Sequence, residues 1–244
     1  MEVSSQAMKM NRIYGEHYKV GVFTNIDYDH ISPTEHASME DYLGCKVSFL
    51  KQCDNVVLYS DTRYFETIYN EVRDKHVVVY GSKESIEKLM SRDDDFFEKD
   101  TDFASIHNED LTDHNSYFEL IYGGENRAYN TNLIGDYNVE NIVAAIISSL
   151  LIGIPNDQIR SSIRDVYVPG RLQVYHWKDR TFMIDYAHNY ISMYRLYEMV
   201  KKTMKPKSIT VVFGCGGERY KKRREDMGRL AEQYADKVVL TMED

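Results

Sequence analysis

The sequence contains little that would support a secreted, disordered or membrane-spanning protein. Among 244 residues there are three cysteines, four prolines and thirteen glycines. Three cysteines without paired spacing exclude a disulfide framework and a four-thiolate zinc site, and they are typical of a reducing compartment. The sequence lacks both an apolar run of roughly 18 residues, as a membrane helix needs, and a basic start followed by an apolar stretch. We therefore expect a globular protein of the cytoplasm without membrane insertion.

Charge is distributed unevenly along the chain. The formal net charge is −9, yet the segment Lys201–Arg224 holds nine Lys and Arg residues against one acidic residue, Glu218. An otherwise acidic chain disfavours nucleic acid as its main partner, and we expect none. The basic segment predicts a smaller anionic ligand, and a solvated basic surface is the open alternative.

Strand and helix signals alternate from the start of the chain. A helix is expected from Ser38, which can cap it, with Asp41 three residues later. Apolar residues at helical spacing make Asn138–Leu151 the clearest helix, and Asn156–Asp165 is a second. Polar turns between residues 100 and 137 predict an antiparallel extension of a sheet. The expected strands are Val20–Asn25, Asn55–Ser60, His76–Tyr80 and Tyr117–Tyr122, with a helix between the second and the third.

Pro169-Gly170 marks a boundary, after which a second alternation begins. It comprises strands at Thr181–Tyr186, Ser208–Phe213 and Lys237–Leu240, and helices at Ile191–Lys202 and Arg223–Ala235. We predict an α/β protein, with a mixed, mostly parallel sheet in a domain of residues 1–168 and the first part of a Rossmann-like domain in residues 169–244. The second domain has few strands and the first opens inside a functional-looking segment, so we expect a fragment of a longer protein.

Lys46 is the most informative single residue. It lies at the edge of the apolar stripe of the helix that begins at Ser38, four residues after Tyr42 and three after Leu43. A lysine drawn towards a core must extend its amine to water, lose its charge or find an anion. The sequence leaves two interpretations open: a lysine whose amine reaches solvent, and a lysine modified to an anionic group that supports a metal ion.

Other polar residues follow the expected strand and helix ends. Carboxylates and imidazoles gather early in the chain, at Glu2, Asp27, Asp29, His30, Glu35 and His36. Oxygen ligands with one imidazole suit magnesium, two histidines also suit zinc, and solvated acidic loops are the alternative. Asn138 and Asn141 are three residues apart on a helix, where Asn138 can cap the helix or both amides can contact a purine. Gly214-Cys215-Gly216-Gly217 lies between a strand and a helix, where backbone N–H groups can bind an anion.

Taken together, these segments resemble the ATP-dependent Mur ligases of peptidoglycan synthesis, and most closely those that add the third amino acid of the peptide. The resemblance covers nearly the whole chain, in the family's order. The segments are Glu2–Ser5, Phe23–His30, Met39–Lys46, Gly135–Asn141, Val168–Arg171, Asp185–His188 and Phe213–Arg219. The chain contains no Gly-x-x-x-x-Gly-Lys-Ser/Thr motif, so it holds no complete triphosphate site, and we expect no ATP turnover from it alone.

The resemblance implies a role for each matching residue. Glu2 and His30 match magnesium ligands, and Lys46 matches a lysine that is carbamylated, acts in catalysis and holds a second magnesium ion. The other matches are Asn138 and Asn141 at adenine, Arg171 and Asp185 at the nucleotide, Ser4 and Arg12 at the UDP-muramoyl peptide, Arg219 at the incoming amino acid, and His188 in the same catalytic cleft.

The implied reaction joins two substrates, UDP-N-acetylmuramoyl dipeptide and a free amino acid. ATP would convert the D-glutamate carboxylate into an acyl phosphate, which the amine of the amino acid attacks to form an amide. The protein's part is positioning and charge neutralisation, with ATP and Mg²⁺ as cofactors.

Several positions depart from the family pattern and keep other interpretations open. Gln6 and Met10 replace the family's usual residues near the substrate, and Asn189-Tyr190 follows Asp-Tyr-Ala-His where Thr-Pro is usual. Glu243-Asp244 leaves the added amino acid open. The alternatives are a related ligase, similar to cyanophycin synthetase or folylpolyglutamate synthetase, and a non-catalytic binding module.

Overall fold

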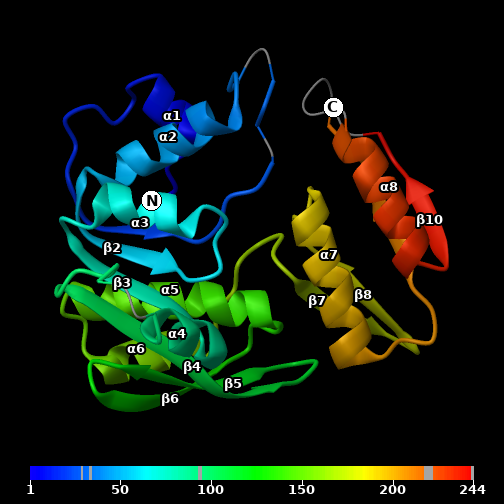
Figure 1. Cartoon of the computed structure of the whole chain (residues 1–244). Coiled ribbons are helices and arrows are strands. Elements are labelled where there is room, and N and C mark those ends of the chain that lie inside the picture. The colour runs from blue at the N-terminus through cyan, green and yellow to red at the C-terminus, as the bar shows by residue number, and fades with distance from the viewer. Residues whose placement is uncertain (29, 33–34, 93–94, 217–221, 243–244) are drawn as a thin grey trace.

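One six-stranded sheet organises the first part of the computed structural model, which describes residues 1–28, 30–32, 35–92, 95–216 and 222–242 (Figure 1). Its strand order is β1-β2-β3-β4-β5-β6, with β1 to β4 parallel and β5 and β6 antiparallel. The strands are β1 (Tyr18–Phe23), β2 (Cys53–Tyr59), β3 (His76–Ser82), β4 (Thr101–Leu111), β5 (Ser116–Tyr122) and β6 (Glu125–Thr131). The predicted mixed, mostly parallel sheet and its antiparallel extension are confirmed.

Helices cover both faces of this sheet. They are α2 (Met39–Leu50), α3 (Phe65–Val72), α4 (Lys83–Met90), α5 (Asp136–Leu151) and α6 (Asn156–Ile163), whereas α1 (Ser5–Lys9) packs against α2. Alternation along the central strands divides the core, because successive side chains point to opposite faces. Val56 and Leu58 of β2 pack with α2, α3 and α4, whereas Val57 packs with α5 and α6. We call residues 1–163 the first unit.

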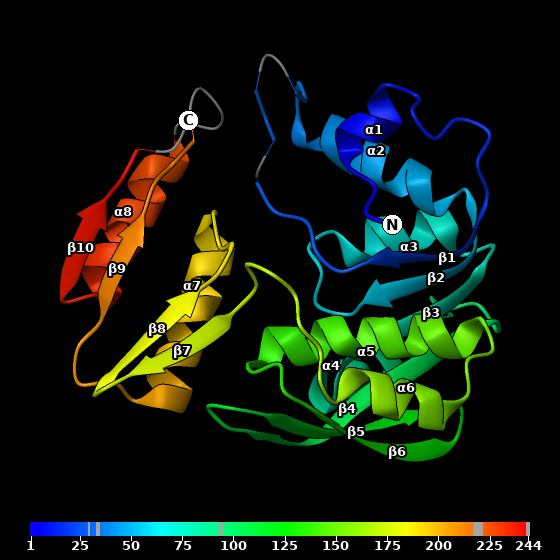
Figure 2. The same cartoon turned by 180° about the vertical axis from the view of Figure 1, so that it is seen from behind.

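The second unit, residues 170–242, lies beside the first (Figures 1 and 2). It consists of β7 (Gln173–Trp177), β8 (Arg180–Ile184), α7 (Tyr190–Met199), the π-helical turn η1 (Val200–Met204), β9 (Thr210–Phe213), α8 (Lys222–Tyr234) and β10 (Lys237–Leu240). The expected parallel pairing is found between β9 and β10. β8 instead forms an antiparallel hairpin with β7, a strand that the sequence analysis missed.

Local sequence signals explain where two helices begin. Ser38 caps α2 as predicted, because its Oγ accepts a hydrogen bond from the Asp41 backbone N–H. The apolar stripe of α2 is buried, and its residues are Met39, Tyr42, Leu43, Val47 and Leu50. The prediction for α5 was two residues late: Gly135 is its N-cap at φ +90°, a left-handed conformation that glycine adopts readily, and Asn138 lies within the first turn. Among the described residues, no helix combines the length and the apolar composition required to span a membrane.

Candidate functional site

A pocket of about 600 Å³ lies beside α2 in the first unit. The N-terminal segment, the residues after β1, α2 and the start of the second unit all contribute to its lining. The lining includes five residues that the sequence analysis selected, Glu2, Ser4, His30, Lys46 and Arg171. Residues far apart in sequence therefore meet at one place, with a carboxylate, an imidazole and two basic side chains around it.

Lys46 reaches this pocket from α2. Its Nζ lies 5.3 Å from the centroid of the Tyr42 ring and 6.0 Å from that of Phe23, so the amine is beside aromatic faces. Burial lowers the pKa of Lys46, and the negative charge of Glu2 partly opposes that shift. A lysine with a lowered pKa carries more free amine at neutral pH, and the free amine is its nucleophilic form.

His30 reaches the pocket from the loop after β1. Its φ of +60° places the backbone in the left-handed region, and its ring lies 5.5 Å from that of Tyr42. The Nδ1 atom lies 3.2 Å from Oε1 of Glu35, whose side chain is only 8% exposed. Oε2 of Glu35 is buried without a hydrogen-bond partner. This carboxylate can hold the proton on Nδ1 and leave Nε2 as the ring's ligand atom.

The side chains at the pocket fit a divalent cation. Glu2 supplies carboxylate oxygens, the ligands that magnesium prefers, and His30 adds an imidazole nitrogen, a ligand more usual for transition metals. The unpartnered buried oxygen of Glu35 is a further negative group beside His30. The free amine of Lys46 is a poor magnesium ligand, whereas a carbamate on the same nitrogen would offer two oxygens. The metal roles remain predictions, because the pocket places these residues together without testing them.

A second cluster joins α1 to α2 and has a different explanation. His36, Asp41 and Cys45 place three possible ligand atoms within 4.8 Å of one another. However, the Lys9 ammonium donates to Asp41 Oδ2 at 2.8 Å and to the Glu35 carbonyl at 2.8 Å. His36 is fully buried, with Nδ1 3.1 Å from Asp41 and Nε2 2.9 Å from Ser5 Oγ. The cation of this cluster is Lys9, and the network fastens α1 onto α2.

The two asparagines selected for adenine lie on α5 outside the pocket lining. Asn138 is buried, and its Nδ2 donates to the Ile134 carbonyl at 2.8 Å. Asn138 is not the N-cap of α5, because the helix begins at Asp136 and Asn138 belongs to its first turn. Asn141 is exposed. Their contact with adenine stays a prediction.

Asp185 builds the turn that carries Arg171. Its Oδ2 accepts from the Leu172 N–H at 2.8 Å and its Oδ1 from the Ala187 N–H at 2.8 Å. The Arg171 guanidinium lies 4.8 Å from the Tyr186 ring centroid and faces the pocket lining. His188 Nδ1 lies 2.9 Å from the Tyr186 carbonyl, outside that lining. Asp185 thus holds the backbone on both sides of the β7–β8 hairpin.

The remaining selected residues lie in separate places. Ser4 lines the pocket and caps α1, accepting from the Ala7 N–H at 3.1 Å. Arg12 is exposed and donates to Met10 Sδ at 3.3 Å, away from the pocket lining. Arg219 lies outside the described residues, as do Asp29 and Gly217, the last residue of the glycine cluster.

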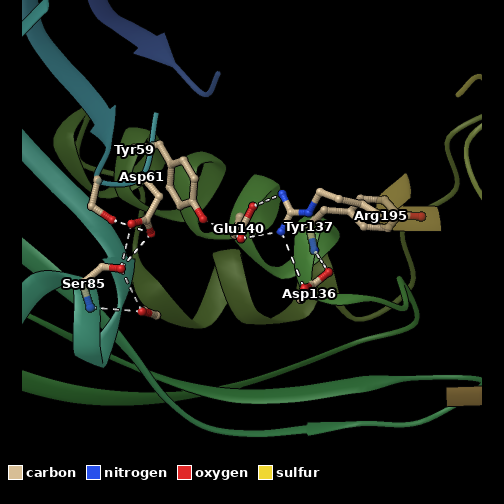
Figure 3. Close-up of polar contacts among 9 residues, drawn as sticks. Tyr59, Asp61, Ser85, Asp136, Tyr137, Glu140 and Arg195 are labelled. Carbon is tan, nitrogen blue, oxygen red and sulfur yellow. Dashed lines mark hydrogen bonds and ion pairs between the residues drawn. The ribbon is translucent and has the colours of Figure 1, made fainter. Parts of the chain in front are cut away.

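One polar cluster between the units was missed by the sequence analysis (Figure 3). Glu140 of α5 receives a hydrogen bond from the Tyr59 hydroxyl at 2.6 Å and two from the Arg195 guanidinium, each at 2.7 Å. Arg195 belongs to α7 in the second unit. No local sequence signal links residues 55 positions apart, so this pair could be found only in the folded chain.

Comparison with known families gives two matches. Residues 1–149 match the family described as Mur ligase middle domain, and residues 170–244 match the family described as Mur ligase, glutamate ligase domain.

Curated proteins are similar over the whole chain. The UDP-N-acetylmuramyl-tripeptide synthetase of Limosilactobacillus reuteri is 34% identical, with 100% of this chain and 48% of that protein covered. The UDP-N-acetylmuramoyl-L-alanyl-D-glutamate–L-lysine ligase of Enterococcus faecalis is 34% identical, with 100% and 46% covered. The chain therefore spans about half the length of the curated relatives it matches.

Solved structures share the fold. A UDP-N-acetylmuramoyl-L-alanyl-D-glutamate–2,6-diaminopimelate ligase matches with a TM-score of 0.65 and 24% identity, over 99% of this chain and 47% of that one. MurF from Acinetobacter baumannii matches with a TM-score of 0.70 and 18% identity, over 92% and 47%. The apo form of L. casei FPGS has a TM-score of 0.66 at 18% identity, over 92% and 51%. At these identities the likeness concerns the fold alone.

Proposed function

The chain belongs to the Mur ligase family, and from this premise we propose that it is part of an ATP-dependent ligase that adds the third amino acid to UDP-N-acetylmuramoyl-L-alanyl-D-glutamate in the cytoplasm. The names of the relatives that match the whole chain support this reaction. The likeness to FPGS concerns the fold alone, so it gives no support to a folate substrate.

The proposed reaction has two steps. The γ-phosphoryl group of ATP passes to the D-glutamate carboxylate, which gives an acyl phosphate and ADP. The amine of the incoming amino acid then attacks the carbonyl carbon, phosphate leaves, and loss of a proton from nitrogen gives the amide. Bound magnesium would supply neutralisation of phosphate charge. What remains for the protein is to hold the reacting groups in line and to balance their charge.

Each selected residue has a part in this proposal. Lys46 reacts through its free amine with carbon dioxide, forming a C–N bond and releasing a proton. Glu2 and His30 would hold one magnesium ion, and the carbamate would help to hold a second. Arg171, at the same pocket, balances phosphate charge. The other assignments are Asn138, Asn141 and Asp185 at the nucleotide, Ser4 and Arg12 at the UDP-muramoyl peptide, Arg219 at the amino acid and His188 in that cleft.

One observation carries the proposal: Glu2, His30 and Lys46 line the same pocket, and the pKa of Lys46 is lowered there. The first test is ¹³C NMR of the chain in ¹³C-labelled bicarbonate. We expect a carbamate signal that Lys46→Arg removes, because a guanidinium does not form it. The matched control is Lys51→Arg, since Lys51 follows the same helix but is exposed and paired with Glu71.

A second measurement tests the identity of the substrate independently of the carbamylation of Lys46. Titration with UDP-N-acetylmuramoyl-L-alanyl-D-glutamate should perturb the amide signals of Ser4 and its neighbours, and titration with a folate should not. A carbamate signal that survives Lys46→Arg contradicts carbamylation at Lys46. Equal changes in the amide signals with both compounds contradict the proposed muramoyl-peptide substrate. Phosphate release from ATP by this chain alone would contradict the expectation that it does not turn over ATP.

A further inference from the structure

We infer that Glu140 and Arg195 form a latch that holds the second unit against the first, with Tyr59 fixing the carboxylate that Arg195 engages. Figure 3 shows the guanidinium of Arg195 facing the Glu140 carboxylate. NH1 donates to Oε2 and NH2 to Oε1, both at 2.7 Å, so the contact is a two-bond fork. Such forks constrain orientation as well as distance, because both N–H groups must align with the two oxygens.

Partial burial and a hydrogen bond from Tyr59 stabilise the latch, and a second carboxylate lies close enough to compete for Arg195. The side chains of Glu140 and Arg195 are 19% and 28% exposed, so the pair is partly shielded from water. The Tyr59 hydroxyl donates to Glu140 at 2.6 Å, and burial together with the Glu140 charge raises the pKa of Tyr59, which keeps that donor protonated. Asp136, 56% exposed and 3.6 Å from Arg195, is a second carboxylate within reach of the guanidinium.

An apolar contact lies beside the latch at the start of α5. Ile134 of the first unit is buried against Leu172 and Met199 of the second, and Tyr137 packs onto the same cluster. A Cβ placed on Gly135 would lie 3.1 Å from Met199 Cγ, so the two units approach closely there. This cluster is small, and small interfaces between domains permit relative motion. The latch is therefore the part that fixes orientation, and the apolar cluster acts as the pivot.

The consequence concerns Arg171. This residue lies at the start of the second unit and lines the pocket that otherwise belongs to the first. Arg171 directly precedes Leu172 of the pivot, so a turn of the second unit changes the direction of the Arg171 side chain relative to the pocket, and Glu140 and Arg195 are positioning residues for it. The inference concerns how the two units are held and does not depend on the proposed reaction.

The test measures the distance between the units in the whole 244-residue chain. Spin labels are attached to Gln158→Cys on α6 and Gln233→Cys on α8, both exposed, after the three native cysteines are replaced by alanine. Double electron–electron resonance should give one narrow distance distribution for the parent. Glu140→Gln and Arg195→Met should each add a population at longer distance. Arg195→Lys should give a smaller added population, because lysine keeps the charge but lacks the fork.

The matched control breaks an arginine–carboxylate pair within the first unit. Arg73 Nε donates to Glu98 at 2.8 Å, and Glu98→Gln should leave the distribution unchanged. Combining Glu140→Gln with Arg195→Met should broaden it no more than either change alone, since both remove one interaction. The inference is overturned if the latch variants keep the parent's distribution, or if the control broadens it equally. Glu140→Gln and Arg195→Lys are mild enough to decide the question should Arg195→Met fail to fold.

Discussion

At the scale of single residues, the buried amine of Lys46 sets a pH dependence. Its folded pKa is lower than the 10.5 of a free lysine because of burial, so the unfolded chain binds more protons between the two values. Stability should therefore rise with pH through that window, and below it the charged amine destabilises the fold. Lys46→Met removes the amine and leaves an unbranched apolar side chain beside Tyr42 and Phe23, so it should raise the free energy of unfolding at neutral pH and flatten the alkaline rise. Urea unfolding across this range measures both effects.

The control for Lys46 is again its exposed neighbour. Lys51→Met should leave the slope of stability against pH unchanged, because the Lys51 side chain is 51% exposed. If Lys46→Met lowered stability at neutral pH, the buried amine would have to be favourably paired, and the pH argument would be wrong.

Asp41 should make the stability of the fold depend on pH at the acidic end of the range. The hydrogen bond from Lys9, with smaller contributions from the Ala37 N–H and His36, lowers its pKa from 3.8 to about 2. Its contribution to stability is thus complete above pH 3.8 and is lost as the pH falls towards about 2. Asp41→Asn should lower stability at neutral pH and reduce the acid-induced loss. Acid titration followed by circular dichroism measures this loss.

Asp157 provides the comparison for Asp41, because it is an exposed carboxylate in the first turn of α6. Asp157→Asn should leave the acid transition nearly where it is. An acid transition that Asp41→Asn does not alter would show that the Lys9 network contributes little to folding.

Among single residues, the sequence indicated those with an unusual chemical setting. Lys46 stood out because a lysine at the edge of an apolar stripe conflicts with its charge, and Glu2 and His30 stood out through the family resemblance. Arg195 gave no such signal, because arginine on a helix is ordinary and its partner Glu140 is distant in sequence. Glu35 was noted only as one of several acids, and its burial beside His30 required the fold.

At the scale of elements, Asp185 holds the hairpin that opens the second unit. Both oxygens accept backbone N–H groups, from Leu172 and Ala187, and Leu172 has a φ of +42°. Asp185→Ala leaves both donors without this acceptor and should lower the stability of the second unit by about 2 kcal/mol, since hydrogen bonds to charged groups contribute roughly 1.5–3 kcal/mol. Fluorescence of Trp177, the single tryptophan, reports unfolding of that unit.

A milder variant is Asp185→Asn, which keeps one oxygen acceptor. It should lower the stability of the second unit by about half as much as Asp185→Ala does. Equal losses for alanine and asparagine would indicate that the charge, rather than the two hydrogen bonds, stabilises the turn.

Elements were predicted well where burial imposed a period, and poorly where it did not. β2 and β3 were found because their apolar runs are buried on both sides. β7 was missed because its residues are half-buried or exposed and show no clear alternation of apolar and polar types. A signal did exist, since two turn residues, Lys178 and Asp179, separate it from β8, and Lys178 has the positive φ typical of tight hairpins.

At the scale of the whole molecule, the two units have very different cores. Among its described residues, the first has two clusters of sixteen buried apolar residues each, on opposite faces of its sheet. The cluster between α7 and α8 has four, Met193, Tyr197, Met227 and Leu230. Because stability follows buried apolar area, the second unit should open before the first.

A pair of leucines tests this order. Leu58 is fully buried in the first unit and Leu230 is 1% exposed in the second, and replacing either by alanine should cost about 2–5 kcal/mol locally. Leu230→Ala should speed hydrogen exchange in α7 and α8 while β2 and β3 stay protected, measured by mass spectrometry. Leu58→Ala should speed hydrogen exchange in the first unit, including β2 and β3. If Leu230→Ala speeds exchange equally in both, the contact between α5 and α7 joins them into one cooperative structure, because no separate opening of the second unit would then be possible.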